Sequence, residues 1–364
     1  MKGIEASAGI QEWNSETSCE ERALLGKYKK EEFEIIKEAL DFAPIIANSK
    51  MKHNFVAEAI MIGSGEFGHV YKLNLTTRKM EKIIQVAVKT IDSDLNDATC
   101  FKALLAEAKV MTFLGKHENV VELIGLCTKD IRFSELIFHC NIIRNKCKCK
   151  KFLIGSGKLY IVLELCAFGS LHTYLISERA TFSPSSDIES NNYALNEAQL
   201  VSWCLEIALG MEYLVSQKVV HGDLATRNVL LNENRTAKIT DFGLSRRLYN
   251  YSVYVRRKNT PLPWRWLSTL VDMKFSTMSD VWSYGICCWE IFELGKRPWC
   301  NYPQFTLDFI SDIKNGVRLE KPSNCRQKYF DDILFPCWKH ERSERPKFTE
   351  IVDVWRTKSK PSDA

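Results

Sequence analysis

The chain has 364 residues, of which 45% are hydrophobic and 26% charged, a balance typical of a soluble globular protein with room for two compact lobes. Its formal net charge of +5 is small for this length, so composition does not indicate a nucleic-acid-binding or membrane-surface protein. No stretch reaches the roughly 18 apolar residues of a membrane span, and the first residues lack the apolar core of a signal peptide. Most of the thirteen cysteines stand singly in apolar runs, such as Cys204, Cys287, Cys288 and Cys337. We therefore expect buried free thiols and a cytoplasmic, reducing location.

The first half of the chain is predicted to be rich in β-strands. Residues 1–54 are polar and highly charged, and we expect a tail that is partly helical or disordered. A helix is predicted from Asn96 to Leu114, because Asn96 or Asp97 can cap its start and Gly115 can end it. Residues 129–157 form a long basic excursion between two of the strands. Five runs have the apolar content and length of strands: 56–62, 69–75, 83–90, 120–127 and 159–165.

The second half is predicted to be mainly helical. Residues 177–196 form a polar loop, and residues 280–294 are apolar nearly all round, which predicts a buried core helix. Five runs have helical periodicity: 200–214, 280–294, 304–315, 329–338 and 347–357. A strand-rich part followed by a helix-rich part predicts an α+β fold of two lobes with a cleft between them.

Two carboxylates and one amide recur in the second half at a spacing suited to phosphoryl transfer. Asp223 is a candidate acceptor for the proton of a hydroxyl nucleophile. Asn228 and Asp241 are candidate ligands for Mg²⁺ ions that neutralise a nucleotide's phosphates. Phosphoryl transfer needs positioning and charge neutralisation more than covalent help, and these residue types supply both.

A glycine-rich segment lies between the first two predicted strands. Its glycines would let backbone N–H groups approach phosphate oxygens closely. Alone the pattern fits a plain hairpin turn or a dinucleotide-binding loop equally well, but it leads into a strand, which disfavours the dinucleotide reading. The segment consists of Gly63, Ser64, Gly65, Glu66, Phe67 and Gly68, with Val70 following on the strand.

A lysine and a glutamate form a second candidate pair. Lys89 follows three apolar residues of a predicted strand, a position that on its own indicates only a strand end. Glu107 lies on the apolar face of the predicted 96–114 helix, three residues after Leu104. Because a carboxylate on an apolar face needs a cationic partner, Lys89 and Glu107 are candidates to pair.

Together these motifs resemble the protein kinase family. His221–Asn228 matches the family's His-Arg-Asp-Leu-x-x-x-Asn loop, except that Gly222 stands where the family has arginine, and Asp241 opens its Asp-Phe-Gly motif. The resemblance implies the two-lobed protein kinase fold, of class α+β, with residues 55–165 as the small lobe and 166–357 as the large lobe. It also implies ATP as phosphoryl donor and Mg²⁺ as cofactor.

The resemblance gives roles to residues that would otherwise be ordinary core or strand residues. Lys89, paired with Glu107, would orient the α- and β-phosphates. The backbone of Glu164 and Cys166 would meet the adenine edge, with Leu163 as gatekeeper. Four apolar side chains would enclose the adenine ring: Ile62, Val70, Ala87 and Leu230.

Other residues of the pattern would act structurally. His221 would be a packed histidine and not a base, in an internal stack with Met111, Leu123 and Phe242. Asp280 would cap backbone amides of the 221–228 loop.

Several motifs resemble tyrosine kinases in particular. Ala225 replaces the lysine of serine/threonine kinases, and Arg227 is placed as in the Ala-Ala-Arg loop of tyrosine kinases, where it would support the substrate side. Pro261–Trp266 resembles the segment that seats the substrate chain beside its tyrosine. Phe335–Trp338 and Arg345–Phe348 resemble the C-terminal signature of the same group.

Within that group the chain looks like the platelet-derived and vascular endothelial growth factor receptors, on the residues Glu164–Leu171 and Tyr254–Arg257. Residues 177–196 would then be a short kinase insert, 1–54 a juxtamembrane tail and 358–364 a C-terminal tail. The resemblance implies protein substrates with tyrosine, dimerisation through a receptor, SH2-type readers of phosphotyrosine, and the cytoplasmic side of the plasma membrane. It implies no nucleic-acid partner.

Regulation is expected to differ from the family pattern. Tyr249, Tyr251 and Tyr254 are candidate phosphorylation sites in the activation loop. A phosphate there would order the loop by pairing with arginines, and Gly222 removes one expected partner. We therefore hypothesise a weakened dependence on phosphorylation.

Two further segments depart from the family. Residues 266–270 lack the glutamate of Ala-Pro-Glu and are about two residues short, so Arg345 is expected to be left as an unpaired buried cation. Residues 129–157 replace a tight turn, and a surface loop or a gene-model error explains them better than a zinc site of Cys140, Cys147 and Cys149. Gly222 and the altered 266–270 segment support a rival hypothesis, a pseudokinase that binds nucleotide and signals as a scaffold, whereas the intact Asp223, Asn228 and Asp241 favour an enzyme.

Overall fold

The computed structural model describes residues 60–65, 68–77, 82–91, 98–127, 160–184, 195–248, 254–255, 263–269 and 273–358. By its contacts the chain divides into two units. One comprises Met1–Leu73, Val88–Asn96 and Gly125–Val162, and the other Asn74–Ala87, Asp97–Ile124 and Leu163–Ala364. The predicted boundary between lobes at residue 165 stays a prediction.

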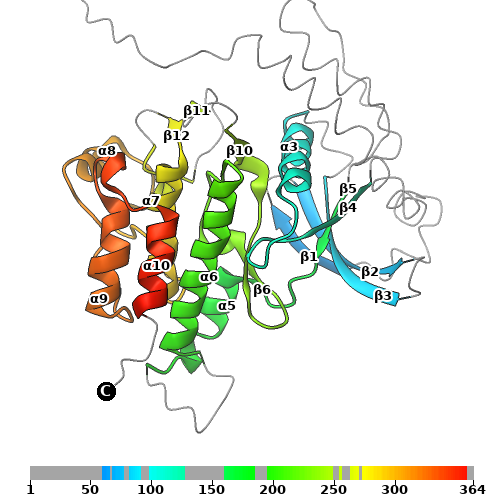
Figure 1. Ribbon diagram of the computed structural model, residues 1–364, viewed down its shortest axis with the longest axis horizontal. Helices are drawn as coiled ribbons and strands as arrows, with labels where there is room; N and C mark the ends of the chain where they lie inside the picture. Colours follow the sequence, from blue (N-terminus) through cyan, green and yellow to red (C-terminus); the bar gives the residue numbers. More distant parts are fainter. Residues whose placement is uncertain are drawn as a thin grey trace, which may run out of the picture. The chain divides into compact units, whose positions relative to one another are not determined.

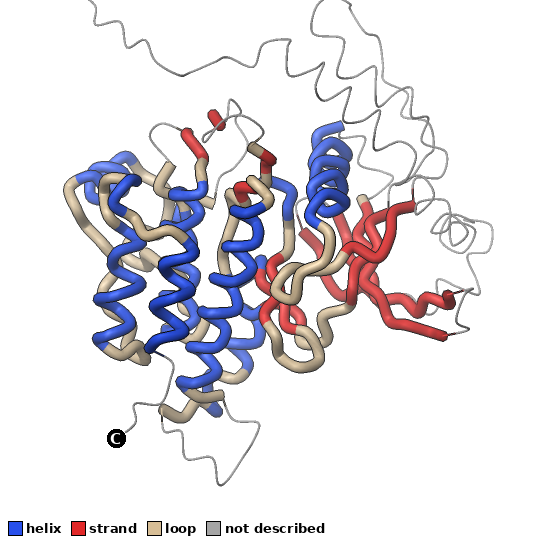
Figure 2. Tube along the Cα trace, viewed as in Figure 1, coloured by secondary structure: helices blue, strands red, loops and turns tan. Residues whose placement is uncertain are grey.

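Strands dominate the first part of the described chain and helices the second, as the colours of Figure 2 show, so the predicted α+β class is confirmed. Five strands form one sheet in the order β1-β2-β3-β5-β4. They are β1 (Ile60–Gly65), β2 (Gly68–Thr77), β3 (Lys82–Thr90), β4 (Leu123–Cys127) and β5 (Tyr160–Glu164). The helix α3 (Ala98–Leu114) follows β3 and ends at Gly115, whose φ of 67° is the left-handed conformation that glycine adopts without strain.

The helical part is built around α6 (Glu197–Ser216), α7 (Thr277–Phe292) and α10 (Phe348–Lys358), which lie side by side in Figure 1. Tyr284 of α7 links all three, because its hydroxyl donates to the Cys204 carbonyl of α6 (2.9 Å) and accepts from Trp355 Nε1 of α10 (2.6 Å). α6 is long and apolar enough to cross a membrane, but residues spread along it, from Leu200 to Leu214, are buried within the unit. It is therefore a core helix of the folded domain.

Short elements complete the helical part. Its helices are α5 (Leu171–Ser177), α8 (Leu307–Lys314) and α9 (Gln327–Tyr329). Its strands are β6 (Gly169–Ser170), β7 (Val219–Val220), β8 (Val229–Leu231), β9 (Ala237–Ile239), β10 (Arg246–Arg247), β11 (Tyr254–Val255) and β12 (Lys274–Phe275). The pairs β10–β7 and β11–β12 and the triple β6-β8-β9 are separate small sheets, and the strands β7 and β8 flank the 221–228 loop.

Two sequence predictions need correction. Residues 120–122 are not part of the predicted 120–127 strand, since Val120 makes only an isolated bridge to Ile239 and β4 begins at Leu123. The predicted 329–338 helix is not a regular α-helix but a π-helical turn, Phe330–Leu334, followed by a 3₁₀ turn, Phe335–Trp338. Pro336 has no N–H to donate, which disfavours a continuous α-helical ladder there.

The predicted burial of the cysteines is confirmed where it is described. Cys204, Cys287, Cys288 and Cys337 are free thiols with no exposed surface. Burial raises the pKa of Cys287 and Cys337 well above the ordinary value of a thiol. They are therefore packing residues. The 129–157 excursion and its three cysteines lie outside the described residues.

Candidate active site

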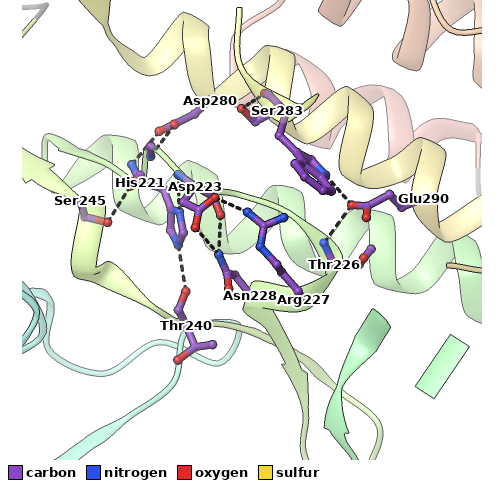
Figure 3. A network of polar contacts seen from close by, with 12 residues as sticks. His221, Asp223, Thr226, Arg227, Asn228, Thr240, Ser245, Asp280, Ser283 and Glu290 are labelled. Carbon is purple, nitrogen blue, oxygen red and sulfur yellow. Dashed lines mark hydrogen bonds and ion pairs between the residues drawn. The ribbon is translucent and has the colours of Figure 1, made fainter. Parts of the chain in front are cut away.

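The 221–228 loop is anchored by a buried carboxylate on α7. Asp280 Oδ2 accepts the backbone N–H of His221 (2.8 Å), and Oδ1 accepts that of Gly222 (2.9 Å) (Figure 3). The predicted capping role of Asp280 is confirmed. Burial raises the pKa of Asp280 to about 7, and the two backbone donors oppose that rise. Gly222 has φ 76°, so glycine relieves the strain that a side chain would cause at this position.

His221 is a structural residue, as predicted. It has no exposed surface, its Nδ1 accepts the Asp223 N–H (3.2 Å), and its Nε2 donates to the Thr240 carbonyl (3.0 Å). Its ring lies 5.4 Å from that of Phe242, centroid to centroid. Burial lowers the pKa of His221 to about 4, so it stays neutral and holds the loop against residues 240–242.

Asp223, Arg227 and Asn228 form one cluster (Figure 3). Arg227 pairs with Asp223 Oδ1, and Asn228 Nδ2 donates to Asp223 Oδ2 (2.9 Å) and to the Asp223 carbonyl (2.7 Å). Burial raises the pKa of Asp223 to about 6. Arg227 opposes this rise, and the nearby charge of Asp241 adds to it. The carboxylate is thus fixed in direction and poised near neutrality, which suits a general base.

Asp241 lies beside this cluster in a strained conformation. The Thr240 N–H donates to the Asn228 carbonyl (3.0 Å), which brings the adjoining Asp241 to the loop. Asp241 has φ 64° and ψ 72°, a left-handed backbone that is uncommon outside glycine and often marks a functional site.

The donor set fits Mg²⁺. Because Asn228 uses its side-chain nitrogen on Asp223, its Oδ1 is left to act as a ligand, and with Asp241 it offers the oxygen donors that Mg²⁺ prefers. In the described part of the chain no group of three or more His, Cys, Asp or Glu side chains forms a metal cluster. Two protein ligands suit an ion that also binds substrate phosphates.

The segment predicted to face the substrate packs on the loop. The Arg227 guanidinium carbon lies 4.2 Å from the centroid of the Trp266 ring, a cation–π contact. Arg265 is 3% exposed and donates to the carbonyls of Pro298 (3.0 Å) and Trp299 (2.6 Å). Arg227 Nη1 is buried and has no hydrogen-bond partner among the residues that the structure describes. The guanidinium is thus held between Asp223 and Trp266.

Arg345 is buried and has no carboxylate partner among the described residues, as expected, but its guanidinium is not left without hydrogen bonds. Its guanidinium donates to the Met278 carbonyl (2.8 Å), the Lys339 carbonyl (2.9 Å) and Ser268 Oγ (3.1 Å), and stacks on Trp282 at 5.0 Å. Burial lowers the pKa of Arg345 to about 10. Carbonyl and hydroxyl oxygens thus satisfy the guanidinium where the family has a glutamate.

The glycine-rich segment belongs to the first unit and forms the β1–β2 hairpin. Its register pairs Gly63 with Val70 and Gly65 with Gly68. A Cβ on Gly68 would lie 2.1 Å from the Thr90 carbonyl oxygen, so this glycine is needed for packing against β3. A Cβ on Gly63 would meet only Val70 at 3.8 Å, so Gly63 is not required by packing within the chain. Glu66 and Phe67 lie outside the described residues.

The other residues that are predicted to bind the nucleotide belong partly to the first unit and partly to the second. Lys89 is half-buried on β3 in the first unit, and Glu107, 1% exposed on α3, is in the second. The predicted burial of Glu107 is confirmed, and its pairing with Lys89 stays a prediction. Of the apolar set, Ala87 is buried, Ile62 is exposed, and Val70 and Leu230 are half-buried.

The Glu164–Cys166 stretch is held in place by bonds that sequence reasoning missed. Glu164 Oε1 accepts Lys238 Nζ (2.8 Å) and the Glu122 N–H (2.7 Å). The Glu164 N–H donates to the Glu122 carbonyl, and the Cys166 carbonyl accepts the Gly169 N–H, both at 3.1 Å. Glu164 and Lys238 are 74 residues apart, so no local sequence pattern indicates this pair.

A second residue missed from the sequence is Glu290 on α7. It is 2% exposed and accepts the Thr226 N–H (3.1 Å) and Trp266 Nε1–H (2.9 Å). The available signal was a carboxylate in the last turn of an otherwise apolar helix.

The predicted phosphorylation sites are only partly described. Tyr249 and Tyr251 lie outside the described residues. Tyr254 is in β11, where it pairs with Phe275 of β12.

Comparison with known proteins identifies the family. Residues 56–354 match the family model described as protein tyrosine and serine/threonine kinase. The tyrosine kinase receptor Cad96Ca of Drosophila melanogaster is 36% identical over 298 residues, which are 81% of this chain and 34% of that protein. Vascular endothelial growth factor receptor 1 of Mus musculus is 32% identical over 349 residues, 80% of this chain and 24% of that receptor. Vascular endothelial growth factor receptor 3 of Danio rerio is 32% identical over 336 residues, 81% of this chain and 22% of that receptor.

The chain thus spans about a third or less of the length of these relatives. The matched residues include the β-sheet, the helical part and the 221–228 loop that Asp280 anchors. The chain therefore belongs to the protein tyrosine and serine/threonine kinase family, as a tyrosine kinase domain homologous to receptor tyrosine kinases.

Proposed function

We propose that this domain is catalytically active and transfers the γ-phosphate of ATP to tyrosine hydroxyls of protein substrates. The observation that carries the proposal is the Asp223 carboxylate, fixed by Asn228 and Arg227 and with its pKa raised to about 6. A base poised near neutral pH can accept a hydroxyl proton and release it again.

In this mechanism Asp223 accepts the proton of the tyrosine hydroxyl as its oxygen bonds to the γ-phosphorus of ATP, while the bond from that phosphorus to the bridging oxygen breaks and ADP leaves. Arg227 would hold Asp223 and support the substrate side through its contact with Trp266. Asn228 and Asp241 provide oxygen ligands for Mg²⁺. ATP would supply the phosphoryl group, and Mg²⁺ held by these oxygens would neutralise the charge of its phosphates.

The remaining predicted residues are proposed to bind the nucleotide. Lys89, oriented by Glu107, would hold the α- and β-phosphates under the glycine-rich hairpin. Because the Glu164 N–H and the Cys166 carbonyl are used within the chain, the adenine contacts would fall to the Glu164 carbonyl and the Cys166 N–H. Ile62, Val70, Ala87 and Leu230 would enclose the ring.

One assay tests this function. The purified chain is incubated with ATP, Mg²⁺ and a tyrosine-containing polymer, with Asp223→Asn as the matched control. We expect phosphotyrosine from the parent chain and a loss of at least a hundredfold in the variant. ATP binding without phosphotyrosine above the control would refute the proposal and support the pseudokinase hypothesis.

The relatives are receptors, so we also propose that the domain works on the cytoplasmic side of the plasma membrane within a longer protein. Dimerisation there would bring two domains together for phosphorylation in trans, and SH2-type readers would bind the products. Expression of the full-length transcript and fractionation of membranes would test this context.

Regulation by phosphorylation is proposed to be weakened, because Gly222 cannot pair with a phosphate. We expect Tyr254→Phe to retain most of the activity. If it abolishes activity as fully as Asp223→Asn does, the idea is wrong.

A further inference from the structure

One face of α7 carries polar side chains inside an otherwise apolar, buried helix. Ser283 and Glu290 follow Asp280 by three and ten residues, a spacing that places all three along one side of the helix. They are only 1%, 1% and 2% exposed. Burying a carboxylate costs free energy unless the carboxylate is well hydrogen-bonded. The hydrogen bonds of Glu290 therefore have to compensate for its burial.

Glu290 joins two segments that are distant in the sequence. A single oxygen, Oε2, accepts both the Thr226 N–H (3.1 Å) and the Trp266 Nε1–H (2.9 Å). Ser283, seven residues before Glu290, donates to the Trp266 carbonyl (2.6 Å), so α7 holds Trp266 by its backbone and by its ring. In Figure 3 Glu290 and Ser283 approach from α7, and Thr226 and Arg227 approach from the loop.

The contacts continue from Trp266 to the reacting group. The Trp266 ring lies against the Arg227 guanidinium at 4.2 Å, and Arg227 pairs with Asp223. Two contacts therefore separate the Trp266–Glu290 hydrogen bond from the proposed base.

The two carboxylates of α7 hold opposite ends of the loop. Ten helical residues separate Asp280 from Glu290, which is about 15 Å along the axis. Ala225 is extended, with φ −162° and ψ 163°. The loop is thus held near both ends by one helix, which restricts the positions open to Asp223.

We propose that Glu290 is a positioning residue for phosphoryl transfer, which holds Trp266, and through it Arg227, in place against Asp223. This role rests on the proposed tyrosine kinase function. In this role Glu290 aligns the side of the site that receives the substrate and does not bind the nucleotide, because its contacts are with the 221–228 loop and the 263–269 segment.

The test compares Glu290→Leu with Glu290→Gln in steady-state assays of peptide phosphorylation. Leucine removes the acceptor, and we expect kcat/KM for a tyrosine peptide to fall about tenfold or more, while KM for ATP changes less than about twofold. Glutamine retains an oxygen that can accept both donors but loses the charge, so we expect a loss of about threefold. Melting temperatures of all variants are measured, and rates are compared at a temperature where each is folded.

Trp266→Phe provides a second variant if Glu290→Leu does not fold. Phenylalanine keeps a ring beneath Arg227 but removes the indole donor, and we expect kcat/KM for the peptide to fall about threefold or more. Trp289→Phe is the matched control, because its indole donates to the Glu320 carbonyl (2.9 Å) on the opposite, more exposed side of α7, and its kinetics should stay at the parent value.

Unchanged peptide kinetics in folded Glu290→Leu or Trp266→Phe would overturn the role of Glu290. So would equal losses for the peptide and for ATP, which would indicate a general loss of folded enzyme. A parent chain that produces no phosphotyrosine overturns the kinase proposal together with this role, and an active parent with unchanged variants overturns this role alone.

Discussion

Replacing Tyr284 with phenylalanine tests the hydrogen-bond chain that ties α6, α7 and α10 together. Tyr284 has no exposed surface, and its hydroxyl bonds to the Cys204 carbonyl (2.9 Å) and to Trp355 Nε1–H (2.6 Å). Phenylalanine keeps the ring, including its edge contact with Phe348 at 5.6 Å, and removes only the oxygen.

The expected cost follows from what is left behind. Two hydrogen bonds are lost, at about 1 kcal/mol each, and the Trp355 N–H is buried without an acceptor, at about 1–3 kcal/mol. The variant no longer buries a hydroxyl, and the desolvation cost that it avoids offsets part of this loss. We therefore expect a net loss of about 2–3 kcal/mol in the free energy of unfolding. For a domain of about 300 residues that lowers the melting temperature by roughly 3–5 °C.

Thermal and urea unfolding measure the change, and a double-mutant cycle with Trp355→Phe separates its parts. Because the double variant removes both donor and acceptor, its loss should be smaller than the sum of the two single losses. Tyr302→Phe is the matched control, since its hydroxyl bonds to Asp312 (2.6 Å) in a half-buried position where water can replace it. A loss below about 0.5 kcal/mol for Tyr284→Phe, or strict additivity, would refute the reasoning.

Three further predictions concern the site and its support. The carboxyl of Asp223, followed by NMR without nucleotide, should titrate near pH 6, and Asp241→Asn should lower its pKa by removing a like charge. Gly222→Arg should cost about 1–2 kcal/mol of stability, measured by thermal unfolding, because residue 222 has φ 76°. Gly285→Ala should cost about 1–2 kcal/mol despite the helix propensity of alanine, because the new Cβ would lie 2.7 Å from Trp338 Nε1.

Each of these has a control and a contrary outcome. Titration of Asp223 near pH 4 would mean that water screens its carboxylate and that burial does not raise the pKa. Gly222→Ala should lose as much stability as Gly222→Arg, since the backbone sets the cost, and a stabilised Gly222→Arg would contradict it. For Gly285 the comparison is Gly316→Ala, where no atom lies within 4 Å and only the φ of 97° adds strain. An unchanged melting temperature in Gly285→Ala would show that Trp338 moves freely.

Local patterns were enough to predict most elements and the motif residues. Apolar periodicity identified α6 and α7, and the Asn96–Gly115 signals identified the helix that became α3 (Ala98–Leu114). The bounds of β4 and the irregular 330–338 helix were missed, because pairing partners and π-turns depend on contacts that no local pattern contains.

The sequence by itself determined which residue types are present for chemistry: Asp223, Asn228 and Asp241 indicate phosphoryl transfer, because that reaction requires a base and oxygen ligands at set spacings. Only the tertiary structure decided how those groups are held. The hydrogen bond of Asp280 to the Gly222 amide was predicted from the sequence. Glu290, in contrast, is 64 residues from Thr226, its partner in the loop, and bonds to it only when α7 packs on the loop. Arg345 likewise takes oxygens from residues up to 77 positions away in place of the missing glutamate. Hydrogen bonds between distant segments depend on packing, so a residue's type indicates its need for a partner, and only the fold supplies that partner.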